Sequence, residues 1–323
     1  MEQRKLMEFG KSSFIVCLPK KWVIENRLKK GDTLNLLENS SDILVSPSLK
    51  EMEPVQKKIV IDTKEKGLAL ISSEIVSAYL NGYDFIEILI GEMETRVTEI
   101  KEIMRNLSGL EIMEQTSTRM VAKDILNPKE IDIPTIIRRM DIIVRSMIDD
   151  GIKCLMENDP QKKKTLVMNI RQRDEDINRL YFLSNRVIRN ALKNPAFGRS
   201  LMMDPWKLHS LAAIILRLEK IGDRQKRIAK FSIDAKFNQK CKKELAEIYS
   251  DMRDKYGEVM KSYYIGNISA AFSVEVSNKE RIERCNGFLK MCNDASAVHI
   301  IENLSGMTTS IKNISRFVIG LQD

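Results

Sequence analysis

The sequence predicts a multidomain α+β protein with three successive parts. Short β-rich segments separated by turn residues fill residues 1–52, and strand and helix patterns alternate through residues 55–127. Through residues 133–323 strand signals disappear and long helical patterns follow one another. A chain of 323 residues normally forms two or three domains, so we expect one domain in each range.

The composition excludes several classes of protein. No apolar stretch approaches the roughly 18 residues that a membrane span needs, and residues 1–11 lack the apolar core of a signal peptide, so we expect a cytoplasmic chain without membrane insertion. Five cysteines, an odd number without CxxC spacing, favour a reducing cytosol over a disulfide framework. With two histidines and no glycine-rich phosphate loop, we do not expect an enzyme.

The first part has the pattern of short strands around one helix. Strands are expected at residues 5–9, 13–18, 33–37 and 43–46, and a helix at residues 20–26 directly after Pro19. Four short strands in about fifty residues bury little surface alone, so this part needs a partner chain to complete its core.

The beginning of this part is also strongly basic. The first 30 residues contain eight lysines and arginines against three glutamates. A local excess of this size can collect phosphate contacts from DNA. The alternative is a solvated basic surface without a nucleic-acid partner.

Residues 4–47 resemble the AbrB/SpoVT family of swapped-hairpin DNA-binding domains. The matching residues are Arg4-Lys5, Gly10-Lys11, Leu18-Pro19, Lys20-Lys21, Leu28 and Gly31-Asp32. The resemblance implies a homodimer of interleaved strands that presents paired basic side chains to DNA. The DNA contacts that it implies are Arg4, Lys5, Lys11, Lys20 and Lys21.

This part departs from the family in two ways. Trp22 stands inside the short helix, and lysines stand where arginines are commoner. Because lysine lacks the planar bidentate guanidinium, contacts with the DNA backbone are favoured over base reading. The alternative role is a dimerisation platform that binds no DNA.

The middle part alternates strands and helices. We expect strands at 58–62, 85–90, 110–113 and 117–122, with helices at 66–80 and 94–107. This βαβαββ order suits a small ferredoxin-like α/β domain. It contains no phosphate loop and no cluster of catalytic residue types, which favours a connecting or dimerisation role.

The third part is predicted to be an antiparallel bundle. Its six expected helices span 134–158, 160–193, 205–232, 236–264, 266–292 and 295–321. Long helices joined by short loops are typical of bundles, and a weak internal likeness suggests two three-helix repeats.

Two acidic motifs stand out in this bundle. Glu219 and Asp223 share one helix face, where two like charges repel by about 0.2–0.5 kcal/mol. Either a bound metal ion or an ion pair with Arg227 could offset this repulsion. Asp174 and Asn178 share a face of the preceding helix and could complete an oxygen-rich site. The alternative is a charged surface helix with Arg173, Arg179 and Arg186 as partners.

These motifs resemble those of the PhoU family of phosphate-uptake regulators. Residues 218–223 read LEKIGD and are followed by Arg227-Ile228-Ala229, and residues 173–180 read RDEDINRL. The resemblance implies tandem three-helix bundles whose acidic motifs can hold iron or zinc. The implied ligand positions are Asp174, Asn178, Glu219 and Asp223, with Asn178 in place of a carboxylate.

The second repeat carries a degraded copy of these motifs. Glu302 aligns with Glu219, but Gly306 aligns with Asp223. Upstream, Lys279 and Glu283 align with Asp174 and Asn178, and a lysine at a ligand position argues against a metal in this half.

The two resemblances together imply a cytosolic, homodimeric, DNA-binding transcriptional regulator that acts negatively on phosphate uptake. The PhoU resemblance adds a phosphate-transporter ATPase or a sensor protein as partner. The alternative is a phosphate-signalling adaptor whose N-terminal part only dimerises it. A third hypothesis, a metalloenzyme on the acidic face, is disfavoured by the few histidines and by Asn178, Lys279 and Gly306.

Overall fold

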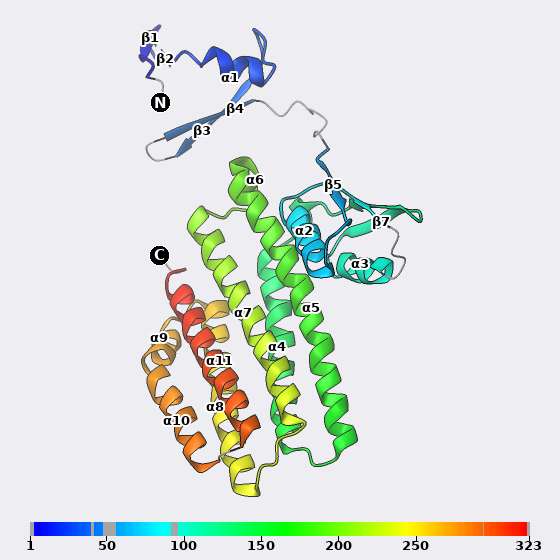
Figure 1. Cartoon of the computed structure of the whole chain (residues 1–323). Helices are drawn as coiled ribbons and strands as arrows, with labels where there is room; N and C mark the ends of the chain where they lie inside the picture. Colours follow the sequence, from blue (N-terminus) through cyan, green and yellow to red (C-terminus); the bar gives the residue numbers. More distant parts are fainter. Residues whose placement is uncertain (1–2, 40–41, 48–55, 92–95, 293, 322–323) are drawn as a thin grey trace. The chain divides into compact units, whose positions relative to one another are not determined.

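The computed structural model describes residues 3–39, 42–47, 56–91, 96–292 and 294–321. The chain divides into two compact units, Met1–Gln56 and Lys57–Asp323. The helices and strands confirm a multidomain α+β protein (Figure 1). Among the helices that the structure describes, none combines the length and apolarity that a bilayer crossing demands.

The N-terminal unit consists of two hairpins around a short helix. Strands β1 (Met7–Phe9) and β2 (Ser13–Ile15) pair antiparallel, and Gly10 in their turn has a φ of 73°, which favours glycine. Helix α1 (Lys20–Glu25) starts directly after Pro19, and strands β3 (Leu34–Asn39) and β4 (Asp42–Pro47) form the second hairpin. The expected order of strands, turns and helix is confirmed.

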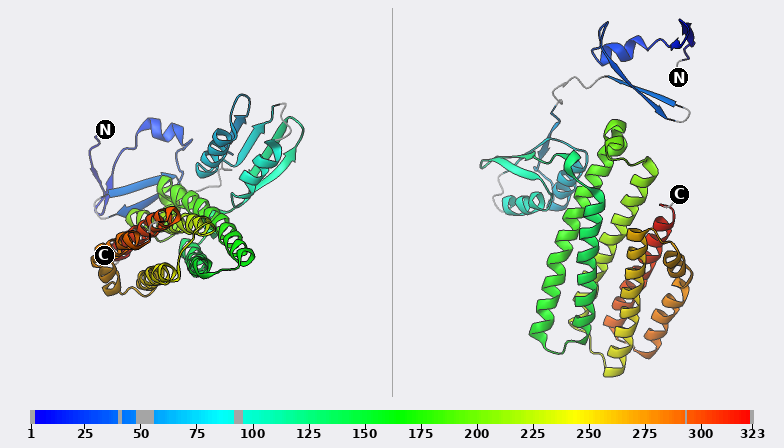
Figure 2. Two further views of the ribbon diagram at one scale, coloured as in Figure 1. Left: turned by 60° about the horizontal axis from the view of Figure 1, so that its bottom comes forward. Right: turned by 180° about the vertical axis from the view of Figure 1, so that it is seen from behind.

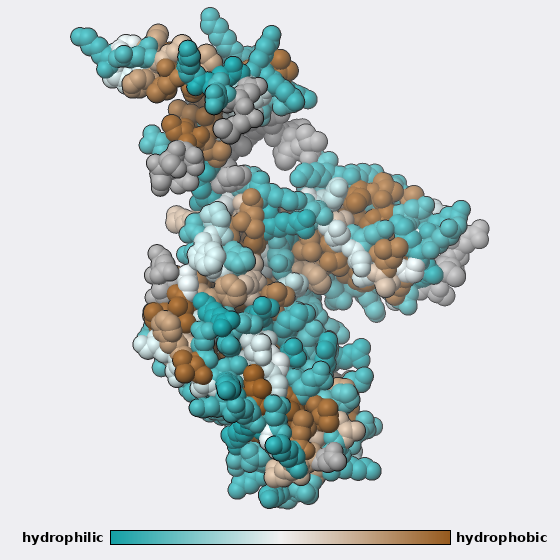
Figure 3. Space-filling model, turned by 60° about the vertical axis from the view of Figure 1, so that its left-hand side comes forward, coloured by the Kyte–Doolittle hydropathy of each residue, from teal (hydrophilic) through white to brown (hydrophobic). Residues whose placement is uncertain are grey.

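No hydrophobic core forms among the residues of this N-terminal unit that the structure describes. Within residues 3–47, no side chain that the structure describes is buried. Phe9 and Phe14 of the first hairpin are each 67% exposed, and Leu36 and Ile43 of the second are each 65% exposed. Figure 3 shows apolar surface on this unit between hydrophilic side chains. Hairpins with so little burial are marginal by themselves.

The middle part is a four-stranded mixed sheet packed against two helices. Its elements are β5 (Lys58–Asp62), α2 (Leu68–Leu80), β6 (Phe85–Leu89), α3 (Arg96–Arg105), β7 (Leu110–Gln115) and β8 (Arg119–Asp124). The strand order is β5-β6-β8-β7, with β5 parallel to β6 and the other pairs antiparallel. Ile71 of α2 and Met104 of α3 are fully buried with Ile86 and Ile88 of β6.

This strand order corrects the ferredoxin-like assignment of the middle part. In a split β-α-β unit another strand lies between the two parallel strands, whereas β5 and β6 are direct neighbours here. Because β7 and β8 close as a hairpin and β8 pairs with the free edge of β6, no strand enters between β5 and β6.

The rest of the chain is helical after one short 3₁₀ turn, η1 (Pro128–Glu130). The helices are α4 (Ile133–Met156), α5 (Pro160–Lys193), α6 (Pro195–Ser200), α7 (Pro205–Ser232), α8 (Gln239–Ile265), α9 (Ser269–Val276), α10 (Asn278–Met291) and α11 (Ala295–Ile319). Asp132, Asp159 and Asp204 cap the first turns of α4, α5 and α7 through their side chains. These caps explain why the expected helix starts agree with the structure.

The helix expected over residues 266–292 is wrong in one respect, because it is split into α9 and α10 at Ser277. The Ser277 hydroxyl donates to the carbonyl of Ser273 at 2.6 Å, and Arg281 donates to the carbonyl of Val274 at 2.6 Å. At the interruption, the Ser273 carbonyl therefore accepts from both the backbone N–H and the hydroxyl of Ser277, and the Arg281 side chain supplies a donor to the Val274 carbonyl.

The long helices form two groups that share one core. Helices α4, α5 and α7 pack on one another, and α11 packs against α8, α9 and α10, as Figures 1 and 2 show. Helices α7 and α11 lie side by side and join the two groups. A single cluster of buried apolar side chains runs through both groups. The expected bundle of two three-helix units is therefore confirmed in its architecture.

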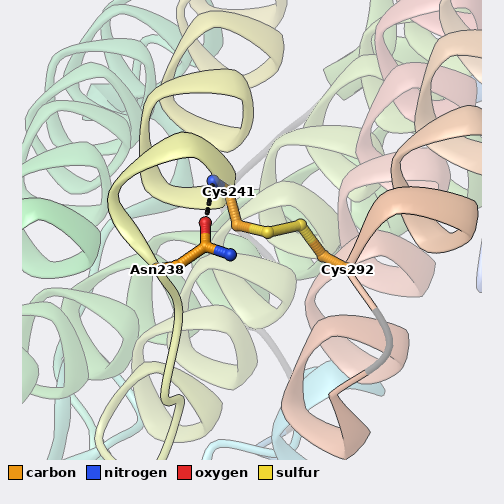
Figure 4. Close-up of a disulfide and its surroundings, with 3 residues drawn as sticks. All are labelled: Asn238, Cys241 and Cys292. Atoms are coloured by element: carbon orange, nitrogen blue, oxygen red, sulfur yellow. Dashed lines mark hydrogen bonds between the residues drawn. A yellow bond between two sulfur atoms is a disulfide. The ribbon is translucent and has the colours of Figure 1, made fainter.

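One cysteine pair differs from the expectation of reduced thiols. Cys241, in the first turn of α8, forms a disulfide with Cys292, which follows α10 (Figure 4). Their Cα atoms are 6.2 Å apart, within the usual span of a disulfide. Cys17, Cys154 and Cys285 are free. The pair is 51 residues apart in sequence, so no local spacing could have revealed it.

Candidate functional site

The candidate site is an acidic cluster between α5 and α7. Asp174 of α5 faces Glu219 and Asp223 of α7, and Asn178 Nδ2 lies 3.5 Å from Asp174 Oδ2 on the same helix. Gly222 of α7 permits this close approach, since a Cβ there would lie 2.9 Å from Ile177 Cδ1 of α5. The structure therefore brings Asp174, Glu219 and Asp223 together across the two helices, with Asn178 beside Asp174.

Two lysines complete this cluster. Lys226 Nζ donates to Asp174 Oδ2 and lies 3.2 Å from Asp223 Oδ1. Lys220 Nζ lies 3.2 Å from Glu219 Oε2 and 3.8 Å from Asp223 Oδ2. Every carboxylate of the cluster thus has a lysine partner.

Neither lysine was predicted from the sequence. The available signal was their i±3 spacing from Asp223 on the same helix, which places them beside that carboxylate. The ion pair expected between Asp223 and Arg227 is absent among the described side chains, and Lys226 takes its place.

Burial shapes the ionisation of the cluster. Asp174 is 3% exposed and Glu219 is 9% exposed. Burial raises the pKa of the Asp174 carboxyl despite the hydrogen bond from Lys226. Burial and then the nearby Asp223 charge raise the pKa of Glu219. Burial alone would lower the pKa of Lys226, but its hydrogen bonds to Asp174 and Asp223 and their charges outweigh it and raise that pKa.

The PhoU resemblance implies iron or zinc at this cluster, which would require its side chains to be arranged as metal ligands. Within the described parts of the chain, no three His, Cys, Asp or Glu side chains are placed to hold one metal ion. The ammonium of Lys226 contacts both Asp174 and Asp223, and Asn178 adds a neutral amide. As arranged, these groups fit a lysine ammonium rather than a metal ion.

The corresponding positions in the second three-helix unit are different. A Cβ added at Gly306 of α11 would collide with the guanidinium of Arg224, which reaches across from α7. Glu302, which aligns with Glu219, is exposed. Lys279 and Glu283 are exposed on α10 and form a 3.8 Å ion pair with each other.

The arginines considered as alternative partners of the acidic run bind elsewhere. Arg173 Nη1 lies 2.5 Å from Asp150 Oδ2 of α4, and Arg186 pairs with Asp124 at the end of β8. Burial works to raise the pKa of Asp150, but Arg173 and Lys153 outweigh it and lower that pKa. Two of the three arginines therefore hold α5 to neighbouring elements and leave the acidic cluster to the lysines.

The basic residues of the N-terminal unit lie on its surface. Arg4 and Lys5 precede β1, Lys11 lies in the hairpin turn, and Lys20 and Lys21 form the first turn of α1. All five are exposed, and Lys21 Nζ lies 3.9 Å from a carboxylate oxygen of Glu25. Their side chains are accessible to a large anionic partner.

The fold and the cluster define a class: a protein with tandem three-helix units and an acidic motif on neighbouring helices. Comparison with known proteins agrees, because residues 137–232 match the PhoU domain family. This range covers most of α4 together with α5 and α7, so the match falls on the first three-helix unit.

One solved structure is also similar. It is the crystal structure of PhoU from Pseudomonas aeruginosa, with 18% sequence identity and a TM-score of 0.46 over 59% of this chain and 92% of that one. No curated protein matches the chain. The family match does not extend to the N-terminal unit, for which the AbrB/SpoVT resemblance stays a prediction.

Proposed function

We propose that the chain is a cytoplasmic, homodimeric transcriptional regulator of phosphate homeostasis that binds DNA and acts negatively on phosphate uptake. The observation that carries the phosphate role is the PhoU domain match at residues 137–232. Proteins of this family are regulatory rather than enzymatic. A phosphate-transporter ATPase or a sensor protein is the partner that this domain would contact.

The proposed DNA contact rests on charge and exposure. The first 30 residues hold eight cations against three carboxylates. Lys11 in the hairpin turn and Lys20 at the start of α1 are both exposed. Lysines at such places suit phosphate oxygens, which dominate affinity for duplex DNA.

The proposed homodimer rests on the missing core of the N-terminal unit. Phe9, Phe14, Leu36 and Ile43 are each about two-thirds exposed. A second copy would cover these side chains with an identical set and would double the number of basic side chains facing DNA. A homodimer would thereby both bury the apolar side chains and enlarge the basic surface that faces DNA.

Coupling between the units would require two states of the protein. A partner that binds the helical unit must have different affinities for the DNA-bound and DNA-free states, since only a difference in affinity shifts such an equilibrium. This requirement makes DNA affinity in the presence of the partner a direct readout of regulation.

The test is salt-dependent binding to duplex DNA by the full-length protein, measured by fluorescence anisotropy. Affinity should fall steeply with salt. Lys11→Ala or Lys20→Ala should each reduce the slope of log K against log salt by about 0.9 for every DNA phosphate that the variant no longer neutralises. Lys240→Ala, an exposed lysine of α8, is the matched control and should leave the slope unchanged.

The absence of duplex binding even at low salt would refute the DNA role. The chain would then act as a phosphate-signalling adaptor. Sedimentation measures the dimer separately: a monomer that stays monomeric at high concentration would refute the homodimer.

A further inference from the structure

Lys226 lies at the centre of the acidic cluster rather than at its edge. Its Nζ contacts Asp174 of α5 and lies 3.2 Å from Asp223 Oδ1 of its own helix. The Asp174 side chain is only 4% exposed, whereas that of Lys226 is 37% exposed. The lysine therefore reaches inward from the surface and ends between two carboxylates on different helices.

In the second three-helix unit, a different protein cation stands near the positions that correspond to the acidic cluster. Gly306 of α11 aligns with Asp223, so one carboxylate is missing there. The space that a side chain at this position would fill is taken by the guanidinium of Arg224 from α7. The charge of Glu302, which aligns with Glu219, acts on the same guanidinium. A protein cation is thus present at the corresponding position of both units.

Electrostatics explains why a lysine ammonium in the cluster excludes a metal ion. Buried carboxylates need a compensating positive charge, and an ammonium on the same chain supplies it without a binding equilibrium. A metal ion would have to displace Lys226 from both aspartates before it could bind their oxygens. It would then meet a ligand set that contains the neutral Asn178 in place of an acid.

We propose that Lys226 and Arg224 take the place of metal ions in the two three-helix units, so that this bundle is independent of metal. Lys226 serves as a fixed counter-ion that ties α5 to α7, and Arg224 fills the space above Gly306 between α7 and α11. Any signal that changes this bundle then comes from a partner or from another ligand, not from iron or zinc.

The first experiment tests metal binding by both three-helix units at once. The full-length protein is incubated with Fe(II) or Zn(II), desalted and analysed by mass spectrometry for metals, and its Tm is measured with and without a chelator. We expect far less than one metal ion per chain and no change of Tm. A stoichiometric metal that survives desalting, or a Tm lowered by the chelator, would overturn the proposal.

The second experiment isolates Lys226. Lys226→Met should lower Tm by roughly 5–15 °C, because Asp174 is left buried without its counter-ion. Adding Asp174→Asn should recover part of the decrease, since it removes the uncompensated charge. Lys230→Met, at an exposed lysine of α7, is the matched control and should stay near the Tm of the unmodified protein.

Two outcomes of this second experiment contradict the role of Lys226. One is a Lys226→Met variant with unchanged Tm. The other is a double variant no more stable than Lys226→Met alone. If Lys226→Met does not fold at all, Asp174→Asn/Lys226→Met must fold, because neutralising both partners removes the buried charge.

Discussion

The guanidinium of Arg186 on α5 pairs with the carboxylate of Asp124 at the end of β8, and both side chains are buried. The same guanidinium lies 4.7 Å from the ring centre of Tyr79 on α2. Nearby, Phe182 of α5 packs against the core of the mixed sheet. These contacts explain why the α/β part and the helical bundle form one compact unit.

Arg186→Met should therefore be severely destabilising. It leaves the buried Asp124 carboxylate without its positively charged partner, although the backbone N–H of Leu126 still donates to it, and breaking a buried pair in this way costs about 3–5 kcal/mol. Urea unfolding followed by circular dichroism measures the decrease. Arg189→Met, an exposed arginine one turn further along α5, should change the free energy of unfolding by at most about 0.5 kcal/mol. Equal stability of the two variants would contradict a structural role for the Arg186–Asp124 pair.

Reduction of the Cys241–Cys292 disulfide is expected to destabilise the bundle. The bond closes a 51-residue segment, and opening it should lower the free energy of unfolding by about 2–4 kcal/mol. Unfolding curves with and without a reductant give this difference. Cys241→Ser should have the stability of the reduced protein both with and without the reductant. Cys17→Ser, at an exposed free cysteine, should behave like the unmodified protein. Mass spectrometry that finds Cys241 and Cys292 as free thiols in unreduced protein would refute the bond.

Gly151 marks a close approach at the centre of the bundle. The Tyr249 hydroxyl of α8 donates to Gln225 of α7, whose amide lies 2.9 Å from Met307 Sδ of α11. A Cβ at Gly151 of α4 would collide with that hydroxyl and lie 2.9 Å from Gln225 Oε1. Four helices from both three-helix units therefore meet at this point.

Gly151→Ala should consequently destabilise the protein by about 1–3 kcal/mol, because the buried tyrosine and glutamine must shift. Gly287→Ala is the control, and the opposite change in stability is expected for it. It is an exposed glycine of α10 with no atom within 4 Å of an added Cβ, so the better helix propensity of alanine should stabilise by up to about 1 kcal/mol. Thermal unfolding shows whether Gly151→Ala lowers the stability and Gly287→Ala raises it. A stabilising Gly151→Ala would contradict the prediction, because it would show that Tyr249 and Gln225 can shift without cost.

Glu219 should impose a pH dependence on stability. Its pKa in the folded chain lies above its ordinary value of 4.5, mainly because it is buried and secondly because Asp223 is near. The folded chain then holds an extra proton between the two pKa values, so the free energy of unfolding falls as pH rises through that interval. At pH values above that interval, ionised Glu219 therefore makes the folded chain less stable than it is at low pH.

Glu219→Gln should weaken this dependence and leave the neutral-pH stability equal or higher. The part that remains comes from Asp174, whose pKa is also raised by burial. Urea unfolding at mildly acidic and at neutral pH gives the comparison. Glu175→Gln, at an exposed glutamate of α5, is the control and should keep the profile of the unmodified protein. A Glu219→Gln profile that falls as steeply as that of the unmodified protein would place the effect on another group.

Much of the candidate site could be predicted because it depends on helix periodicity. Asp174 with Asn178, and Glu219 with Asp223, share helix faces at four-residue spacing, and antiparallel packing of consecutive helices brings the faces together. The role of Lys226 was not predicted. Its partner Asp174 is 52 residues away, and only the packing of α5 on α7 shows which cation reaches that buried carboxylate.

The order of strands and helices was determined by local sequence, since turn residues, capping aspartates and apolar periodicity act within a few residues. The basic, core-poor N-terminal unit was equally determined by composition. Tertiary structure alone decided the β5-β6-β8-β7 strand order, the Cys241–Cys292 bond and the partners of Arg186. Each of these joins positions far apart in the chain, and such pairings depend on which surfaces pack together once the elements have formed.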